Sequence, residues 1–175
     1  MLLNIVHYGD KILREKARPV PVVTPELVNV ARDMVETMYK ARGVGLAAEQ
    51  VGRLESMCVI DVPASCEEDD ETRTFNAAVA MPLVMFNPII ISAEGSQCGK
   101  EGCLSFPNMG GNVTRPNQVT CQYTDIHGAP QIITVKGFLA RAVCHETDHL
   151  KGILYVDHMD EKSREKVIKK LQKKK

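Results

Sequence analysis

The sequence lacks any apolar run of about 18 residues or more, the length that a membrane-spanning helix requires. Its first residues, MLLNIVH, contain no basic segment and no long apolar core, so they do not resemble a signal peptide. They are also not rich in Arg and Ser, as organelle transit peptides are. These absences predict a cytoplasmic protein without a membrane partner.

Net charge is also absent, because 22 Lys and Arg side chains balance 22 Asp and Glu side chains. The charges are unevenly placed: residues 161–175 contain eight basic and two acidic side chains, and residues 67–71 are five consecutive acids. Both stretches are typical of solvated surface, and residues 63–79 are expected to form a mobile loop. The alternative for the basic tail is contact with RNA phosphates, which would give binding without sequence specificity.

Disulfides are not expected, although the chain has six cysteines. A chain of 175 residues without a secretory signal is predicted to keep its thiols reduced. With 44% apolar residues it can bury one good core, so residues 1–175 are predicted to form a single domain.

Helical and strand patterns both occur along the chain. Thr24-Pro25 is a typical helix start, and apolar residues then recur at helical spacing until about Gly43. Strands and helices do not alternate as in βαβ proteins, which predicts the α+β class. The other expected elements are an irregular segment at 1–23, strands at 57–62, 118–124 and 131–135, two strands within 83–92 separated by Asn87-Pro88, a turn at 107–111, and helices at about 138–150 and 161–172.

The most informative motif is HETDH at residues 145–149. On a helix, His145 and His149 lie one turn apart on the same face, where two imidazoles can bind one divalent metal. Glu146 borders that face and could accept a proton from water at the metal. Phe138 and Ala142 share the face and could line a pocket for an apolar substrate side chain.

A third ligand is needed, because catalytic metal sites commonly use three protein ligands. Cys103 is the best candidate, since Gly102 before it lets the backbone approach a helix closely and a thiolate binds iron or zinc well. The other cysteines are predicted to be small buried apolar residues: Cys58, Cys66, Cys98, Cys121 and Cys144.

The segment GVGLAAEQ at residues 43–50 contains two glycines and one amide. It predicts a tight turn packed against the metal-bearing helix. Its exposed backbone at Gly43, Val44 and Gly45 could hydrogen-bond an extended peptide. Gln50 could donate its side-chain amide to a developing oxyanion.

These two motifs, with EGCLS at residues 101–105 between them, make the chain resemble the peptide deformylases, metal-dependent enzymes that remove the formyl group from nascent bacterial polypeptides. The flanking sequences LREKA at 13–17 and LKGILY at 150–155 also match. The resemblance spans nearly the whole chain. It implies mostly antiparallel strands packed around a central metal-binding helix, with further helices toward the N-terminus and the C-terminus.

The resemblance also implies the metal site. Cys103, His145 and His149 would be the ligands of one divalent ion. Members of the family use Fe(2+) as the physiological metal and also accept Ni(2+), Co(2+) or Zn(2+). Ligand spacing alone does not choose among these metals.

The remaining roles follow from the same resemblance. Glu146 would be the general acid and base, and Gln50 with the backbone N–H of Leu104 would form the oxyanion hole. The substrates would be N-formylmethionyl peptides, and the products would be formate and a peptide with a free N-terminal methionine. The basic C-terminal helix at 161–175 would allow contact with the ribosome.

Two positions depart from the family pattern. Position 49 is Glu, where Pro or Thr is common, and position 144 is Cys, where Gln is common. If Glu49 turned inward, it could weaken oxyanion stabilisation, whereas on the surface it would do little. Cys144 is expected in the packed core.

Two rival functions stand beside deformylation. One is a peptidase of the His-Glu-x-x-His class that cuts internal peptide bonds, against which the upstream cysteine ligand argues. The other is an inactive homologue that binds metal or ribosomes, against which the intact Glu146 argues, since binding a metal needs no base.

Overall fold

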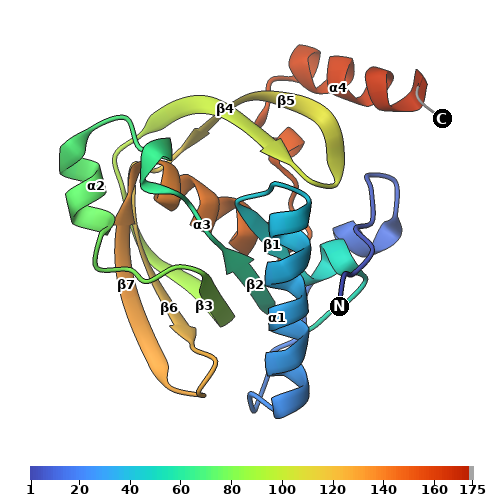
Figure 1. Cartoon of the computed structure of the whole chain (residues 1–175). Coiled ribbons are helices and arrows are strands. Elements are labelled where there is room, and N and C mark those ends of the chain that lie inside the picture. Colours follow the sequence, from blue (N-terminus) through green and yellow to red (C-terminus); the bar gives the residue numbers. More distant parts are fainter. Residues whose placement is uncertain (174–175) are drawn as a thin grey trace.

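The computed structural model describes residues 1–173 and has an α+β fold in which strands surround one central helix, α3 (Gly137–His149) (Figure 1). All strand pairs are antiparallel. The predicted fold class and the central helix are therefore confirmed. Lys174 and Lys175, the end of the predicted basic tail, lie outside the described residues.

The strands form two sheets. The larger has five strands in the order β1-β2-β3-β6-β7, and the smaller is the ribbon β4-β5. The strands are β1 (Gly45–Ala47), β2 (Met57–Ile60), β3 (Leu83–Glu94), β4 (Gln97–Cys103), β5 (Phe106–Arg115), β6 (Gln118–Thr124) and β7 (Pro130–Lys136).

Helix α1 begins where the sequence supplies a cap. Thr24 accepts the N–H of Leu27 at 3.2 Å at the start of α1, as its N-cap position predicts. The other elements are α1 (Pro25–Lys40), α2 (Asp70–Asn76), α4 (Glu161–Lys173) and the short 3-10 turns η1 (Lys11–Arg14), η2 (Ala48–Val51), η3 (Ala64–Cys66) and η4 (Tyr155–His158). Within residues 1–173, none of the helices combines the length and the apolar character that crossing a membrane requires.

Helix α3 lies between the five-stranded sheet and the β4-β5 ribbon (Figure 1). Its residues Leu139, Val143 and Cys144 belong to the same buried apolar cluster as Met85 of β3 and Val135 of β7. The expectation of buried cysteines is confirmed for Cys58, Cys121 and Cys144, whereas it was wrong for Cys98, which is exposed, and Cys66 is only half-buried. Helix α3 is thus held on a rigid support, which fixes the residues on its other face.

Two predictions about strands were wrong. Residues 83–92 lie in one strand, β3, because Asn87 adopts φ 52° and the register shifts between Phe86 and Ile89, so the strand bulges without ending. Residues 107–111 lie within strand β5. Gly111 packs closely against Met159, since a Cβ at this position would lie 2.4 Å from its Cε and would move that side chain.

The acidic segment also differs from the expected mobile loop. It contains η3 and α2, and Asp69 caps α2 by accepting the N–H of Thr72 at 2.7 Å. Glu67 is buried and reaches the start of α3. The composition of this segment suggested a solvated loop because it does not show that these carboxylates bind backbone N–H groups. The N–H groups that Glu67 binds are in addition distant in the sequence.

Candidate metal and catalytic site

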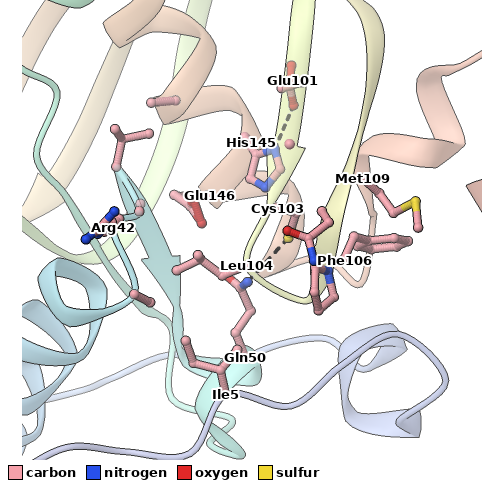
Figure 2. Close-up of a pocket in the computed structure, with 18 of the residues that line it drawn as sticks. Ile5, Arg42, Gln50, Glu101, Cys103, Leu104, Phe106, Met109, His145 and Glu146 are labelled. Atoms are coloured by element: carbon pink, nitrogen blue, oxygen red, sulfur yellow. Dashed lines mark hydrogen bonds and ion pairs between the residues drawn. The ribbon is translucent and has the colours of Figure 1, made fainter. Parts of the chain in front are cut away.

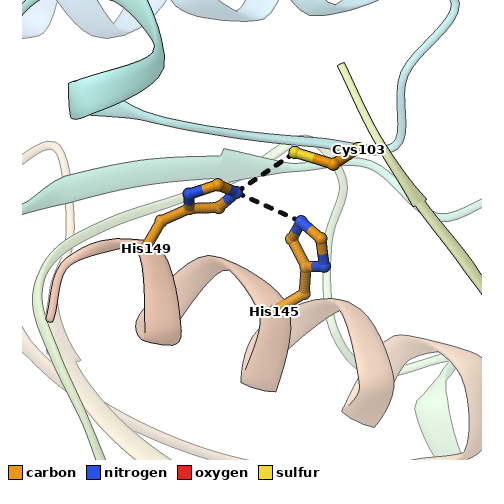
Figure 3. Close-up of side chains that lie close together, drawn as sticks. All are labelled: Cys103, His145 and His149. Atoms are coloured by element: carbon orange, nitrogen blue, oxygen red, sulfur yellow. Dashed lines mark hydrogen bonds between the residues drawn. The ribbon is translucent and has the colours of Figure 1, made fainter. Parts of the chain in front are cut away.

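Three side chains with metal-binding atoms meet beside α3. The Nε2 atoms of His145 and His149 lie 3.2 Å apart, and Sγ of Cys103 lies 3.4 Å from Nε2 of His149 (Figure 3). Cys103 ends β4, where the pairing with β5 shifts register. All three ligand atoms lie within 4.8 Å of one another. The predicted ligand set is therefore brought together by two chain segments, β4 and α3.

The donor set fits a divalent metal. Nδ1 of His145 is hydrogen-bonded to Glu101 Oε1 at 2.6 Å, which leaves Nε2 to face the other ligand atoms. Burial and the neighbouring His145 hold the pKa of His149 well below its usual value, so this ring is neutral. Although burial opposes it, the acidic groups Glu146, Cys103 and Glu101 raise the pKa of His145. These acidic groups give the site a negative potential that favours a cation.

Glu101 connects the metal-binding face to a buried ion-pair network. Its carboxylate accepts hydrogen bonds from Arg115 at 2.8 and 3.1 Å and from Arg141 at 2.9 Å. Arg115 also donates to Asp148 at 2.6 Å. Although burial opposes it, the bonds from His145 and Arg115 hold the pKa of Glu101 well below its usual range. Glu101 therefore stays ionised and fixes the orientation of the His145 ring.

Glu146 lines the same cavity as Cys103 and His145. Its carboxylate is 2% exposed, and its Oε1 has no hydrogen-bond partner among the described residues. Burial raises the pKa of Glu146 to about 7. A Cβ at position 45 would lie 2.4 Å from its Oε2, so a larger residue there would displace the Glu146 carboxylate. The expected close packing between residues 43–50 and the metal-bearing helix is confirmed.

Gln50 points its amide nitrogen toward the ligands (Figure 2). Its Oε1 accepts the N–H of Ala47 at 3.0 Å. Its Nε2 donates to Oγ of Ser105 at 3.1 Å and lies 3.4 Å from Sγ of Cys103. The side chain is therefore held at both ends, and its N–H groups are oriented before any substrate arrives.

A cavity of about 650 Å³ opens beside this cluster (Figure 2). Leu104 also lies in its wall, and a Cβ at position 43 would lie 2.6 Å from Cδ1 of Leu104. His149 does not line the cavity and is only 1% exposed. The cavity wall includes the sequence-predicted residues Gly43, Val44, Gly45, Gln50, Cys103, Leu104, Phe138, Ala142, His145 and Glu146.

The departure at position 49 turns out to be internal. Glu49 is 0% exposed, and neither of its carboxylate oxygens has a hydrogen-bond partner among residues 1–173. Burial, with a smaller contribution from the charge of Glu146, raises the pKa of Glu49 to about 8. A mainly neutral carboxyl group therefore lies in the core next to the site.

The sequence interpretation assigned no role to Glu101, Arg115 or Arg141. One signal was available for Glu101, which lies two residues before Cys103, because residues two apart share a face of a strand. No local signal marks the arginines, which reach Glu101 from positions 14 and 40 residues away.

Known proteins resemble this chain over nearly its whole length. A sequence model of the family described as "Polypeptide deformylase" matches residues 2–165. A peptide deformylase of Endomicrobium trichonymphae is 43% identical over 99% of this chain and 95% of its own length. One from Lachnoclostridium phytofermentans is 45% identical over 90% of this chain and 88% of its own length.

Solved structures agree with the sequence comparisons. The crystal structure of peptide deformylase from Ehrlichia chaffeensis in complex with actinonin is 34% identical and superposes with a TM-score of 0.89, covering 99% of this chain and 98% of that one. The Synechococcus elongatus peptide deformylase complex with actinonin is 37% identical, with a TM-score of 0.83, covering 97% and 88%.

Proposed function

Because this chain belongs to the polypeptide deformylase family, whose members are metal-dependent hydrolases that remove the N-formyl group from nascent peptides, we propose that Cys103, His145 and His149 hold the metal. Formyl-group hydrolysis is accordingly the activity of this protein. The observation that carries the residue assignment is the meeting of the three ligand atoms beside Glu146, where Cys103, His145 and Glu146 line the wall of one cavity.

The metal that we propose is one Fe(2+) ion, with Zn(2+), Ni(2+) or Co(2+) as substitutes. The support is the resemblance to the family together with the ligand set, because one thiolate and two imidazoles suit iron and zinc. When bound, a divalent metal supplies Lewis acidity, which polarises a carbonyl oxygen and makes water a stronger acid.

Glu146 is the general acid and base in this proposal. Its carboxylate takes one proton from the water that attacks the formyl carbon. It then gives this proton to the amine nitrogen as the carbon–nitrogen bond breaks, so that formate and a free amino terminus result. Its position in the cavity wall and its unpartnered Oε1 support this role, because the free oxygen can accept a proton.

Gln50 and the backbone N–H of Leu104 stabilise the oxyanion of the tetrahedral intermediate. The support for Gln50 is the fixed direction of its Nε2 toward Cys103. Preorganised donors of this kind contribute most because they need no rearrangement during the reaction.

Replacement of Gln50 by alanine is expected to lower kcat/KM by about 10²–10³-fold, the usual effect of removing one oxyanion donor. The measurement is formate release from formyl-Met-Ala-Ser with metal content determined in parallel. Gln122→Ala is the matched control, because Gln122 is exposed on β6. A metal-loaded Gln50→Ala enzyme with an unchanged rate would remove Gln50 from the mechanism.

The substrate backbone binds in an extended form along Gly43, Val44 and Gly45. The support is that β1 is an edge strand of the five-stranded sheet, so its outer edge can pair with an added strand. Phe138 and Ala142 contact the methionine side chain, since both are apolar members of the cavity wall. We also propose a cytoplasmic location, which a supply of formylated nascent chains from bacterial ribosomes supports.

The two rival functions are not favoured. The family match argues against a peptidase of internal bonds. The presence of Glu146 beside the ligands argues against a protein that only binds metal or ribosomes.

The basic helix α4 is the proposed contact with the ribosome. It packs through Val167 and Leu171 against an apolar cluster that includes Val113 of β5. In Figure 1 it lies at the periphery of the molecule, beside β5. Its lysines therefore remain on the outside, where they can contact RNA phosphates without sequence preference.

Replacement of four α4 lysines by glutamine is expected to weaken ribosome binding about tenfold at low salt, because each lost phosphate contact lowers both the affinity and its salt dependence. The measurement is cosedimentation with ribosomes over a range of KCl concentrations. Formate release from a short peptide should not change. If the α4 variant and the control bind alike, the proposal is wrong. The variant replaces Lys162, Lys166, Lys169 and Lys170, and the control replaces Lys11, Lys16, Lys40 and Lys151.

A further inference from the structure

The helix that carries the two histidines has no cap of its own. Lys136 occupies the N-cap position of α3 in an extended conformation, with φ −124° and ψ 168°, and its side chain makes no capping hydrogen bond. Lysine has no acceptor atom for this purpose. The first N–H groups of α3 must therefore be satisfied from elsewhere, because helix starts leave up to four of them unpaired.

Glu67 supplies the missing cap from the far side of the sequence. Its Oε1 accepts the N–H of Phe138 at 2.6 Å, and its Oε2 accepts the N–H of Leu139 at 3.1 Å. The residue is 5% exposed. Its negative charge also lies at the positive end of the helix dipole, which is the favourable end for a carboxylate.

The segment around α2 holds Glu67 in place. Nδ2 of Asn76 donates to Glu67 Oε2 at 3.1 Å and to the carbonyl of Lys136 at 3.0 Å, while Oδ1 of Asn76 accepts the N–H of Lys136 at 2.9 Å. Nη2 of Arg73 donates to the carbonyl of Glu67 at 2.7 Å. Figure 1 accordingly places α2 beside the end of β7 from which α3 begins.

Gly137 makes this contact possible. It adopts φ +64°, and a Cβ at this position would lie 2.4 Å from Oε1 of Glu67. The glycine therefore serves both the left-handed backbone and the approach of the carboxylate. Together, Glu67, Asn76 and Gly137 form one interlocking contact at the start of α3.

The cap acts directly on the substrate cavity. Phe138, whose N–H Glu67 binds, lines the cavity, and Ala142 follows one turn later. The metal-binding end of the helix is held separately, by Glu101 at His145 and by Arg115 at Asp148. Loss of the cap should therefore disturb the first turn of α3 far more than the ligands, because helices fray from their ends.

We propose that Glu67 is a positioning residue for the methionine pocket: by capping α3 it sets the place of Phe138 and thereby the selectivity for the substrate side chain. This inference rests on the proposed role of Phe138 and Ala142 in contacting that side chain. The acidic segment that carries Glu67 then serves substrate recognition, although no atom of Glu67 touches the substrate.

The test compares Glu67→Ala with the wild type in metal-loaded form. The expected result is an increase in KM for formyl-Met-Ala-Ser of about tenfold, with kcat within about twofold and the metal content unchanged, because a loss of uniform binding acts on KM alone. The preference for formyl-Met over formyl-Ala peptides should fall severalfold. Glu68→Ala is the matched control, since Glu68 is the adjacent acid and is exposed, and it should behave as the wild type.

A second variant tests the mechanism and remains informative if Glu67→Ala folds poorly. Lys136→Asp provides a local N-cap that can accept the N–H of the second or third helical residue, the same groups that Glu67 binds. In the Glu67→Ala background it should restore most of the KM and of the selectivity. Glu67→Gln, which retains acceptor oxygen but not charge, should be intermediate.

Two results would overturn the inference. One is unchanged KM and selectivity in Glu67→Ala. The other is a combined decrease in kcat and metal content with an increase in KM that Lys136→Asp does not restore. That result would make Glu67 a residue of general stability only. Phe138→Ala separates this inference from the proposed function. If Phe138→Ala leaves the selectivity unchanged, the proposed methionine pocket is wrong. If Phe138→Ala relaxes the selectivity but Glu67→Ala has normal kinetics, only the role of Glu67 is contradicted.

Discussion

Replacement of Glu146 by alanine is expected to lower turnover by about 10²–10⁴-fold, the usual contribution of a positioned general acid and base. The carboxylate is buried, lies in the cavity wall beside His145 and keeps one oxygen without a partner. No other carboxylate in that wall can replace it, because Glu101 is bound to Arg115, Arg141 and His145. The proton transfers would then fall to solvent.

The measurement is formate release from formyl-Met-Ala-Ser by anaerobically prepared enzyme, with the metal identified and counted in each sample. Both the wild type and Glu146→Ala should contain one iron per chain, because Cys103, His145 and His149 are intact in both. Glu165→Ala, which removes an exposed glutamate of α4, is the control. Near-normal turnover in metal-loaded Glu146→Ala would refute the assignment of the base, and zinc in place of iron in the wild type would refute only the proposed metal.

Replacement of Glu49 by glutamine is expected to stabilise the protein at alkaline pH. Burial raises the pKa of Glu49 to about 8 from an ordinary value of 4.5, and the groups that face it are Glu146 of α3 and Cys58 of β2. The folded state therefore holds a proton that the unfolded state releases. Stability is complete below about pH 4.5, falls as the pH rises toward 8, and is constant above that pH.

The gain from Glu49→Gln should accordingly be near zero at low pH and approach at most about 5 kcal/mol above pH 8, since each pKa unit corresponds to roughly 1.4 kcal/mol. Urea unfolding of metal-free protein at several pH values measures it without the pH dependence of metal binding. Glu68→Gln controls for the loss of one charge at an exposed site. A difference that does not change with pH would show that Glu49 is already ionised in the folded protein.

The histidine pair and its neighbouring acid were predictable from sequence because their geometry is local to one helix. His145, Glu146 and His149 depend only on helical periodicity, which Leu139 and Val143 reinforce from the opposite face. Cys103 and Gln50 were only candidates from their local context, and their roles needed the family resemblance, since the segments that carry them are distant from α3 in sequence. Sequence patterning thus located the candidate site residues but not the residues that hold them in place.

The supports were missed because they are pairings between distant segments. Glu67 contacts Phe138 across 71 positions, and Glu101 contacts His145 across 44. The composition of an acidic run is the same whether all its side chains are solvated or one of them is buried against backbone N–H groups. Composition alone therefore did not reveal the burial of Glu67. The bulge at Asn87 was missed for a related reason, since its side chain bonds both backbone groups of Val20 at 2.7 Å.

The carboxylate of Glu101 makes substitutions at several positions depend on one another. Removal of its charge would leave the guanidinium groups of Arg115 and Arg141 buried without their common partner, and the imidazole of His145 without its anchor. A single replacement among these residues would give a less stable intermediate protein, because it leaves buried charges without partners. Replacement of these residues is therefore expected to require concerted changes.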